Sequence, residues 1–326
     1  MPTKKIQPGQ AARIMTGAPL PPGADAVVPV EETDFNQRAP GTPLPEKVAI
    51  FKAAKLGANI RKRGSDIRRG ESILPHGQRL RAQDLGMLAM LGVAQVPVTR
   101  KPRVALLSSG DELLSVDEPL SDGKIYDVNS YTLRAMLNAA GCEIIPLGVA
   151  ADTPESVRAA LEKAKDADLI LSSAGVSMGS FDYIRAVIEK DGALSFWRIN
   201  MRPGKPLTFG AYKNIPFIGL AGNPVSAFVG FMVFVRPVVK KMLGRRTQAQ
   251  GHMRVRLAEP LQSDGRESYL RAIIHRENGQ LNAQLTGHQG SGNLFSMVQA
   301  NALLIIPAGV KSLNKGAEVE AWLLNS

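Results

Sequence analysis

The sequence predicts an α/β protein of several domains, in which a doubly wound, mostly parallel α/β domain is flanked by β-rich domains and ends in a small C-terminal β-barrel. Three observations support this prediction. Apolar strand patterns alternate with helical patterns over residues 101–245, which is typical of a parallel sheet covered by helices. Residues 251–326 show short alternating strands separated by turns, as in a small barrel. Residues 1–81 show short strand-like runs between closely spaced glycines and prolines.

The first hundred residues predict two small regions. We expect a partial β-rich domain over residues 1–60 and a linking β/helix domain over residues 61–100. In the second region, leucines at helical spacing predict a helix from Arg81 that ends at Gly92. A brief strand is expected over Ala94–Val98, before a domain junction at Lys101-Pro102.

The α/β domain is expected over residues 101–245 and the barrel over residues 246–326. One helix is expected from Ser130 to Ala140 with Asn129 as its N-cap, another opens at Thr153-Pro154, and a long apolar helix runs from Pro224 to about Leu243. The strands expected between these helices are Val104–Ser108, Glu143–Val149, Asp168–Leu171, a run from Ser195, and Phe217–Leu220. The strands expected in the barrel are His252–Leu257, Tyr269–His275, Gln280–Leu285, Ala302–Ile306 and Glu318–Leu323.

The stretch after the central strand predicts a ligand-binding loop. Ser173, Gly175 and Ser177 follow the apolar run and cannot fill a core, whereas they let the backbone approach a ligand. Asp182 then opens a helical pattern. The strand that ends at Ser108-Ser109 resembles the central strand, so the two loops share one pocket if the strands are neighbours. The alternative is a solvated connection with Asp182 as an ordinary N-cap.

Composition favours a small anionic partner. Forty basic and 29 acidic side chains give a formal net charge of +11. Aromatic residues make up only 5% and are not interleaved with the basic residues, so we expect no nucleic-acid partner. No apolar run approaches a membrane span, and the single cysteine, Cys142, fits a buried position in a cytoplasmic protein.

Acidic and basic residues follow the predicted strands. Glu112, Asp127 and Asp182 are expected at one edge of the sheet, where carboxylates could hold Mg²⁺ beside a phosphate; each could instead be a cap or turn residue. Arg198, Arg202, Lys205 and Arg271 could neutralise an oxyanion, with a solvated charged face as the alternative. Ser226 follows Pro224 at the start of a helix, among N–H groups that attract an anion. Walker-type, dinucleotide and Gly-x-Ser-x-Gly motifs are absent.

Several motifs together resemble one family. They are Thr16-Gly-Ala-Pro, Arg63-Gly-Ser-Asp66, Ser109-Gly-Asp-Glu112, Ile125-Tyr-Asp127-Val-Asn129, Ser173-Ala-Gly-Val-Ser-Met-Gly-Ser-Phe-Asp182, Arg202-Pro-Gly-Lys205-Pro206 and Gly222-Asn-Pro-Val-Ser226. Their order and spacing are similar to those of the molybdopterin molybdenumtransferases, the MoeA and gephyrin E-domain family. In that resemblance, residues 1–60 and 61–100 correspond to parts of the family's domains II and I.

The resemblance implies a homodimer in which adenylated molybdopterin and molybdate react, with Mg²⁺, to give molybdenum cofactor and AMP. It also implies a molybdopterin adenylyltransferase as partner. The catalytic residues would be Glu112, Asp127, Asp182 and Lys205, the three acids also serving as metal ligands. The substrate-binding residues would be Thr16, Asp66, Ser173, Gly175, Ser177, Arg198, Arg202, Lys205, Pro206, Ser226, Arg271 and Ser291.

Three departures from the family pattern bear on this reading. The family's N-terminal segment with an Asp-Gly-Tyr-Ala motif is not found, so we expect a member that lacks its first several tens of residues. Ala174 stands where the family has glycine, which requires a negative φ at this residue. Arg202 stands where many members have lysine. The alternatives are a truncated or inactive paralogue that acts as a molybdopterin-binding scaffold, and a related molybdopterin adenylyltransferase.

Overall fold

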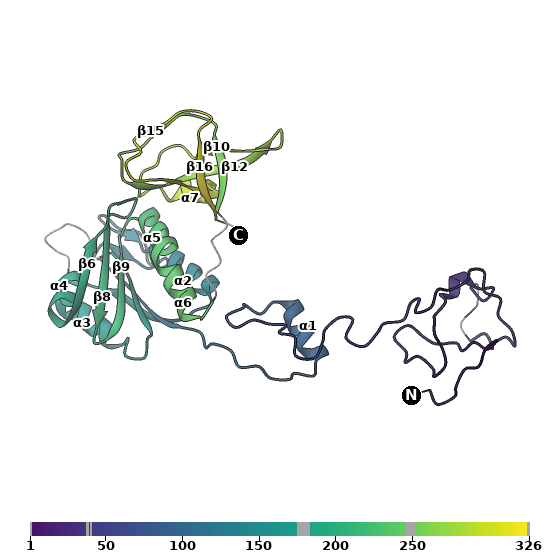
Figure 1. The fold of residues 1–326 in the computed structure, drawn as a ribbon. Helices are drawn as coiled ribbons and strands as arrows, with labels where there is room; N and C mark the ends of the chain where they lie inside the picture. Colours follow the sequence, from purple (N-terminus) through teal and green to yellow (C-terminus); the bar gives the residue numbers. More distant parts are fainter. Residues whose placement is uncertain (1, 37–38, 40, 175–182, 246–251, 325–326) are drawn as a thin grey trace. The chain divides into compact units, whose positions relative to one another are not determined.

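A computed structural model describes residues 2–36, 39, 41–174, 183–245 and 252–324 (Figure 1). The chain divides into two compact units, Met1–Pro75 and His76–Ser326.

The first unit is built mostly from hydrogen-bonded loops. Its regular structure comprises the 3₁₀ helix η1 (Val30–Glu32) and an isolated bridge between Thr33 and Ile50. Loop contacts such as Val27 N–H to the Ala58 carbonyl, at 2.9 Å, connect distant parts of the unit. Over the part of residues 1–60 that the structure describes, the expected strand-like runs therefore form no ladder beyond that bridge. Proline lacks a backbone donor and glycine weakens strands, which is the physical reason.

The second unit contains a six-stranded mixed sheet in the order β4-β1-β5-β9-β8-β6. The first four strands are parallel, as predicted, and β8 and β6 add two antiparallel pairings at one edge. The condition for a shared pocket is met, because β1 and β5 are neighbours and pair with Ser108 opposite Ser173. The strands are β1 (Arg103–Ser109), β4 (Glu143–Ala150), β5 (Leu169–Ser173), β6 (Gly192–Arg198), β8 (Pro206–Tyr212) and β9 (Ile215–Leu220).

Helices cover both faces of this sheet, so the doubly wound prediction is confirmed (Figure 1). On one face, Leu133 and Leu137 of α2 (Val128–Ala140) pack with Phe231 and Val239. On the other face lie α3 (Pro154–Glu162) and α4 (Tyr183–Asp191). The long helix expected from Pro224 is divided into α5 (Pro224–Gly230), the π-helical turn η2 (Phe231–Val235) and α6 (Arg236–Met242). No helix among the described residues has the length and apolar character to cross a membrane.

Two local predictions need correction. Asp127, and not Asn129, is the N-cap of α2, and its carboxylate accepts a hydrogen bond from the Ser130 N–H at 3.1 Å. Both residue types favour N-caps, so sequence alone does not separate them. The strand expected over Ala94–Val98 does not form, because this segment has no partner strand among the described residues. The helix before it, α1 (Ala82–Met90), is found as predicted.

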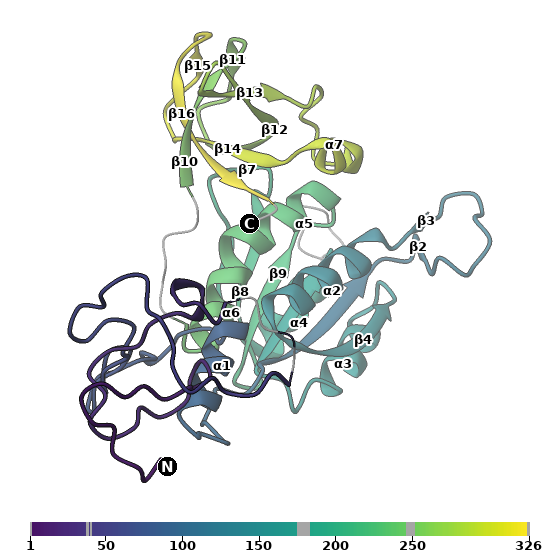
Figure 2. The same ribbon diagram turned by 90° about the vertical axis from the view of Figure 1, so that its right-hand side faces the viewer.

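The C-terminal strands close into a barrel, as predicted. β10 (His252–Leu257), β16 (Glu318–Leu323), β14 (Ala302–Ile306), β12 (Glu267–Glu277) and β13 (Gln280–Leu285) pair in that order, and β13 pairs again with β10. Valine, leucine and isoleucine side chains fill the barrel. The short strand β7 (Met201–Arg202) pairs with β12 and so joins the barrel to the sheet domain beside α5 (Figure 2). The remaining elements are β2 (Leu113–Leu114), β3 (Ile125–Tyr126), β11 (Leu261–Gln262), β15 (Ser312–Leu313) and α7 (Leu294–Gln299).

Candidate functional site

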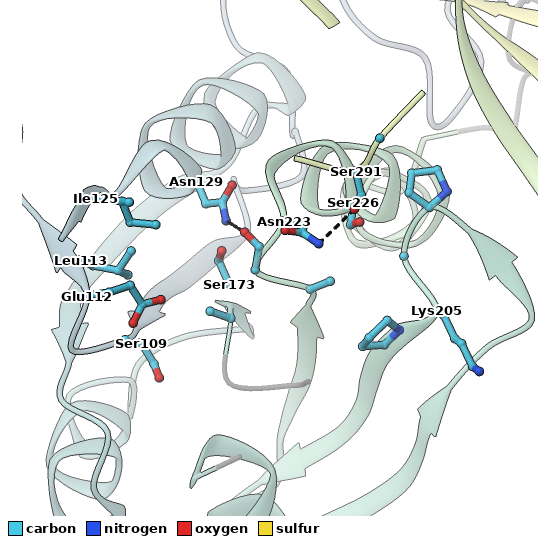
Figure 3. Close-up of a pocket in the computed structure, with 18 of the residues that line it drawn as sticks. Ser109, Glu112, Leu113, Ile125, Asn129, Ser173, Lys205, Asn223, Ser226 and Ser291 are labelled. Carbon is cyan, nitrogen blue, oxygen red and sulfur yellow. Dashed lines mark hydrogen bonds between the residues drawn. The ribbon is translucent and has the colours of Figure 1, made fainter. Parts of the chain in front are cut away.

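A cavity of about 700 Å³ lies where the parallel strands β1, β5 and β9 end. Open α/β sheets bind ligands at this edge. The segments after the three strands supply part of the lining, and the β7–β8 turn and the barrel supply the rest (Figure 3). The lining residues are Ser109, Gly110, Glu112, Leu113, Ile125, Asn129, Asp152, Ser173, Ala174, Arg202–Pro206, Ala221–Asn223, Ser226, Arg266 and Gln289–Ser291.

The structure brings many of the predicted site residues into this one cavity. They come from separate parts of the second unit, and they line the cavity together: Glu112, Ser173, Arg202, Lys205, Pro206, Ser226 and Ser291. The expected shared pocket of β1 and β5 is therefore present.

One wall of the cavity is basic. Arg202 and Lys205 come from β7 and the turn before β8, and Arg266 comes from the barrel. The Asp264 carboxylate contacts Arg266 at 2.5 Å and Arg202 at 3.7 Å. The hydrogen bond from Arg266 lowers the pKa of Asp264, and the Arg202 charge acts in the same direction. Lys205 is exposed and pairs with no carboxylate among the described residues, so this wall carries excess positive charge.

Arg271 lies behind the basic wall and does not line the cavity. Its side chain is fully buried. The guanidinium donates to the carbonyls of Gln289 at 3.2 Å and Gly290 at 2.9 Å, and to Ser296 Oγ at 3.0 Å. Burial lowers the pKa of Arg271 to about 10, with a further contribution from Arg202, so the group remains charged at neutral pH. The arginine thus holds the loop that presents Ser291.

The same loop contacts the start of α5. Asn223 Nδ2 donates to Ser291 Oγ at 3.0 Å, as Figure 3 shows, and the Val225 N–H donates to the Ser291 carbonyl at 3.1 Å. The free N–H groups expected around Ser226 are therefore fewer than predicted, because Val225 is already bonded and Pro224 has no N–H. Ser226 is buried and lines the cavity at this point.

Of the two predicted metal-binding acids that the structure describes, Glu112 and Asp127, only Glu112 lines the cavity. Glu112 lines the cavity with its carboxylate close to Gly110, whose φ of +147° is a conformation that favours glycine. Asp127 is buried as the N-cap of α2 and does not line the cavity. Asp152 does line it and accepts a hydrogen bond from Ser109 Oγ at 3.1 Å. Among the described residues, no three carboxylate, imidazole or thiol groups form a metal cage.

Gly175, Ser177 and Asp182 fall outside the described residues. Arg198 is stacked on Trp197, 3.7 Å from the ring centroid, and pairs with Pro206 across the β6–β8 ladder. In the first unit, Asp66 forms an ion pair with Arg61 at 2.9 Å, and Thr16 is exposed in a turn.

Ala174 overturns the expectation of a negative φ. Its φ is +70°, a conformation that costs a residue with a Cβ about 1–2 kcal/mol. The neighbouring Gly222 is also constrained, because a Cβ added there would lie 3.2 Å from the Ala174 Cβ. The methyl group is accommodated in this strained conformation at the edge of the cavity.

Sequence reasoning missed several lining residues, namely Asn129, Asp152, Asn223, Arg266 and Gln289. Local signals mark Asn129 as a helix cap and place Asp152 beside the Thr153 cap of α3, so they conceal the part that both residues play in the cavity. Arg266 and Gln289 enter the cavity through the docking of the barrel, which no local pattern reports. For Asn223, its position immediately before Pro224 at a helix start was an available signal.

Comparison with known proteins gives concordant results for each region. Residues 1–92 match the model described as "MoeA N-terminal region (domain I and II)", residues 105–241 match "Probable molybdopterin binding domain", and residues 254–324 match "MoeA C-terminal region (domain IV)". The molybdopterin molybdenumtransferase of Haemophilus influenzae is 37% identical over 95% of this chain and 76% of its own length. That of Nostoc sp. is 38% identical over 96% of this chain and 72% of its own length.

Solved structures show similarity to the same family. Two crystal structures of MoeA from Pyrococcus horikoshii superpose with TM-scores of 0.79 and 0.77 at 34% and 30% identity. They cover 99% and 98% of this chain, and 78% and 77% of the solved chains.

The α/β domain, the closed barrel and the basic cavity between them define a protein of molybdenum cofactor biosynthesis with a molybdopterin-binding type of fold. More narrowly, the chain belongs to the molybdopterin molybdenumtransferase family and is a transferase of that family.

Proposed function

We propose that this protein inserts molybdate into adenylated molybdopterin, releasing AMP and giving molybdenum cofactor. One observation carries the proposal: the basic wall of Arg202, Lys205 and Arg266 faces a cavity at the carboxyl ends of the parallel strands. Such a wall attracts a dianion such as molybdate and the phosphates of a nucleotide-linked pterin.

Each side chain has a role that its position supports. Arg202 and Lys205 bind molybdate, and the hydroxyls of Ser226 and Ser291 donate hydrogen bonds to it. Arg271 keeps the Ser291 loop in place. As the phosphoanhydride is cleaved, negative charge develops on the departing AMP, and fixed cations in the cavity stabilise it without reorganising. Water supplies the oxygen that replaces AMP on the pterin phosphate. The bound molybdate then forms two Mo–S bonds with the dithiolene, and one of its oxo groups leaves with the two thiol protons as water.

Magnesium belongs to the proposal. Mg²⁺ beside a phosphate commonly takes one or two carboxylates together with substrate oxygens, and so does not need a cage made by the protein. Glu112 and Asp152 both line the cavity and fit that requirement, whereas the Asp127 carboxylate caps α2. A magnesium ion held there would neutralise phosphate charge.

The proposal extends to the assembly and its location. A homodimer that receives its substrate from a molybdopterin adenylyltransferase is supported by the family motifs. A cytoplasmic location is supported by the single, buried Cys142, whose pKa burial raises to about 11, as befits a structural thiol. The intact basic wall favours an active enzyme over an inactive scaffold.

The test is molybdate-dependent release of AMP from adenylated molybdopterin in the presence of Mg²⁺. Lys205→Ala should reduce turnover at least tenfold, because it removes an exposed cation that contacts the cavity. The control is Lys190→Ala, which removes an exposed lysine at the end of α4, outside the cavity lining, and should leave turnover unchanged. Equal turnover in all three proteins would contradict the proposed function.

A further inference from the structure

The carboxylate of Asp264 pairs with the basic wall and has no role in the proposed reaction. It lies in the turn between β11 and β12. Both sides of this turn are fixed, because the Ser263 N–H donates to the Lys311 carbonyl at 2.7 Å and the Gly309 N–H donates to the Gly265 carbonyl at 2.8 Å. The barrel therefore determines where the carboxylate lies.

Asp264 contacts the two arginines of the wall in different ways. Arg266 donates to it from the backbone N–H at 3.1 Å, from Nε at 3.1 Å and from Nη2 at 2.5 Å. The remaining guanidinium nitrogen of Arg266, Nη1, donates to the Met201 carbonyl at 3.3 Å. Arg202 lies 3.7 Å from the same carboxylate oxygen, which is too far for a hydrogen bond. Asp264 thus occupies Arg266 with hydrogen bonds and acts on Arg202 by charge alone.

Asp264 carries a lasting negative charge. The side-chain hydrogen bond from Arg266 lowers the pKa of Asp264, so the carboxylate is ionised at neutral pH. Among the described residues it is the one acid that pairs with Arg202 or Arg266, and it does not line the cavity. An anion in the cavity that binds Arg202 therefore shares this arginine with Asp264, and the two negative charges repel each other.

The geometry points to Asp264 as the residue that sets how tightly the basic wall holds its oxyanion, because it compensates part of the charge of Arg202 and Arg266. This inference rests on the proposed function, since it concerns the affinity of the same molybdate site. Molybdate is a substrate that has to leave the wall for the dithiolene. Binding that stabilises the ground state more than the transition state slows such a transfer. Asp264 keeps the molybdate weakly enough bound to be transferred.

A purely structural role for Asp264 predicts the opposite change in binding. If the carboxylate served only to hold Arg266 and Arg202 in place, its removal would disorder the wall and weaken molybdate binding. If it sets the affinity, its removal exposes more positive charge to the cavity and strengthens binding. The direction of the change in the molybdate dissociation constant therefore separates the two roles.

The experiment measures that dissociation constant by calorimetry for the wild type and four variants. Asp264→Asn removes the charge at nearly constant size, and Asp264→Ser is a second neutral variant in case the first does not fold. Asp264→Glu keeps the charge beside the arginines. The matched control is Glu318→Gln, which neutralises another half-exposed carboxylate of the barrel, 3.6 Å from Arg256 and outside the cavity lining. Thermal melting establishes that each variant is folded.

We expect both neutral variants to bind molybdate about threefold more tightly, a modest factor because solvent screens a carboxylate that is 37% exposed. Asp264→Glu should return the affinity to that of the wild type, and Glu318→Gln should leave it unchanged. In turnover, the KM for molybdate and kcat of the neutral variants should both fall about threefold, as expected when the ground state is stabilised.

Unchanged or weaker molybdate binding in a folded neutral variant would overturn the inference and leave Asp264 with a structural role. Equal tightening in Glu318→Gln would also overturn it, because the net charge of the protein would then explain the effect. A wild type that binds no molybdate would refute the proposed function itself, and this inference with it.

Discussion

The two sides of the cavity are built in different ways. The side with Glu112, Asn129 and Ser173 comes from the loop after β1, the start of α2 and the end of β5, which all belong to the sheet domain. The basic side brings together the β7–β8 turn with Arg266 and the Gln289–Ser291 loop of the barrel. The first side depends on local sheet topology, and the second depends on how the barrel docks. Variants should therefore affect the two sides for different reasons.

The largest effect in this comparison is expected at Arg271, which supports the barrel side. Arg271→Lys keeps the charge, but an ammonium cannot match the planar fork that reaches Ser296 and the carbonyls of Gln289 and Gly290. We expect molybdate affinity and turnover to fall more than tenfold, with a loss of about 2 kcal/mol in the free energy of unfolding from unpaired buried groups. Calorimetry with molybdate and denaturant unfolding measure these.

A matched control for that variant is Arg276→Lys, on the same strand but exposed and outside the cavity lining. Arg276→Lys should leave molybdate affinity, turnover and the free energy of unfolding unchanged. If Arg271→Lys binds molybdate with the affinity of the wild type, a positive charge at this position is sufficient for molybdate binding, and the guanidinium does not position the loop.

A substitution at Ala174, on the sheet side, should have a smaller effect on stability, and it should stabilise the protein. Glycine tolerates the φ of +70° observed there, so Ala174→Gly should relieve strain worth about 1 kcal/mol, offset in part by greater freedom of the unfolded chain. The melting temperature should rise by about 2 °C. Calorimetric melting of the two proteins decides the sign, and a lower melting temperature for the glycine variant would show that the alanine methyl contributes more by packing than its backbone strain costs.

The difference between the sheet side and the barrel side of the cavity also explains which site residues could be predicted from the sequence. Residues 101–245 alternate strand and helix patterns, and the cavity side that depends on them, with Glu112 and Ser173, was predicted from local signals. The barrel strands were also found at nearly the expected bounds, because turns separate short alternating runs there. The family resemblance, rather than periodicity, connected Ser291 with the site.

Other features depended on long-range contacts that no local pattern reports. The β7–β12 pairing joins Arg202 to Ser268, and this contact places Arg266 in the cavity. Asn129 and Asp127 are both good N-cap residues, so the sequence could not tell which caps α2 and which lines the cavity. In the first unit, strand-like composition was misleading because prolines and glycines prevented a ladder.

The central claim is that the barrel-dependent side of the cavity binds the molybdate. Diffraction from crystals grown with molybdate, measured at the molybdenum absorption edge, tests it most directly. The account predicts an anomalous peak in contact with Arg202, Lys205 and Ser226, and no such peak in Lys205→Ala crystals. A strong peak beside Glu112 and Asp152, or a peak outside the cavity, would contradict it.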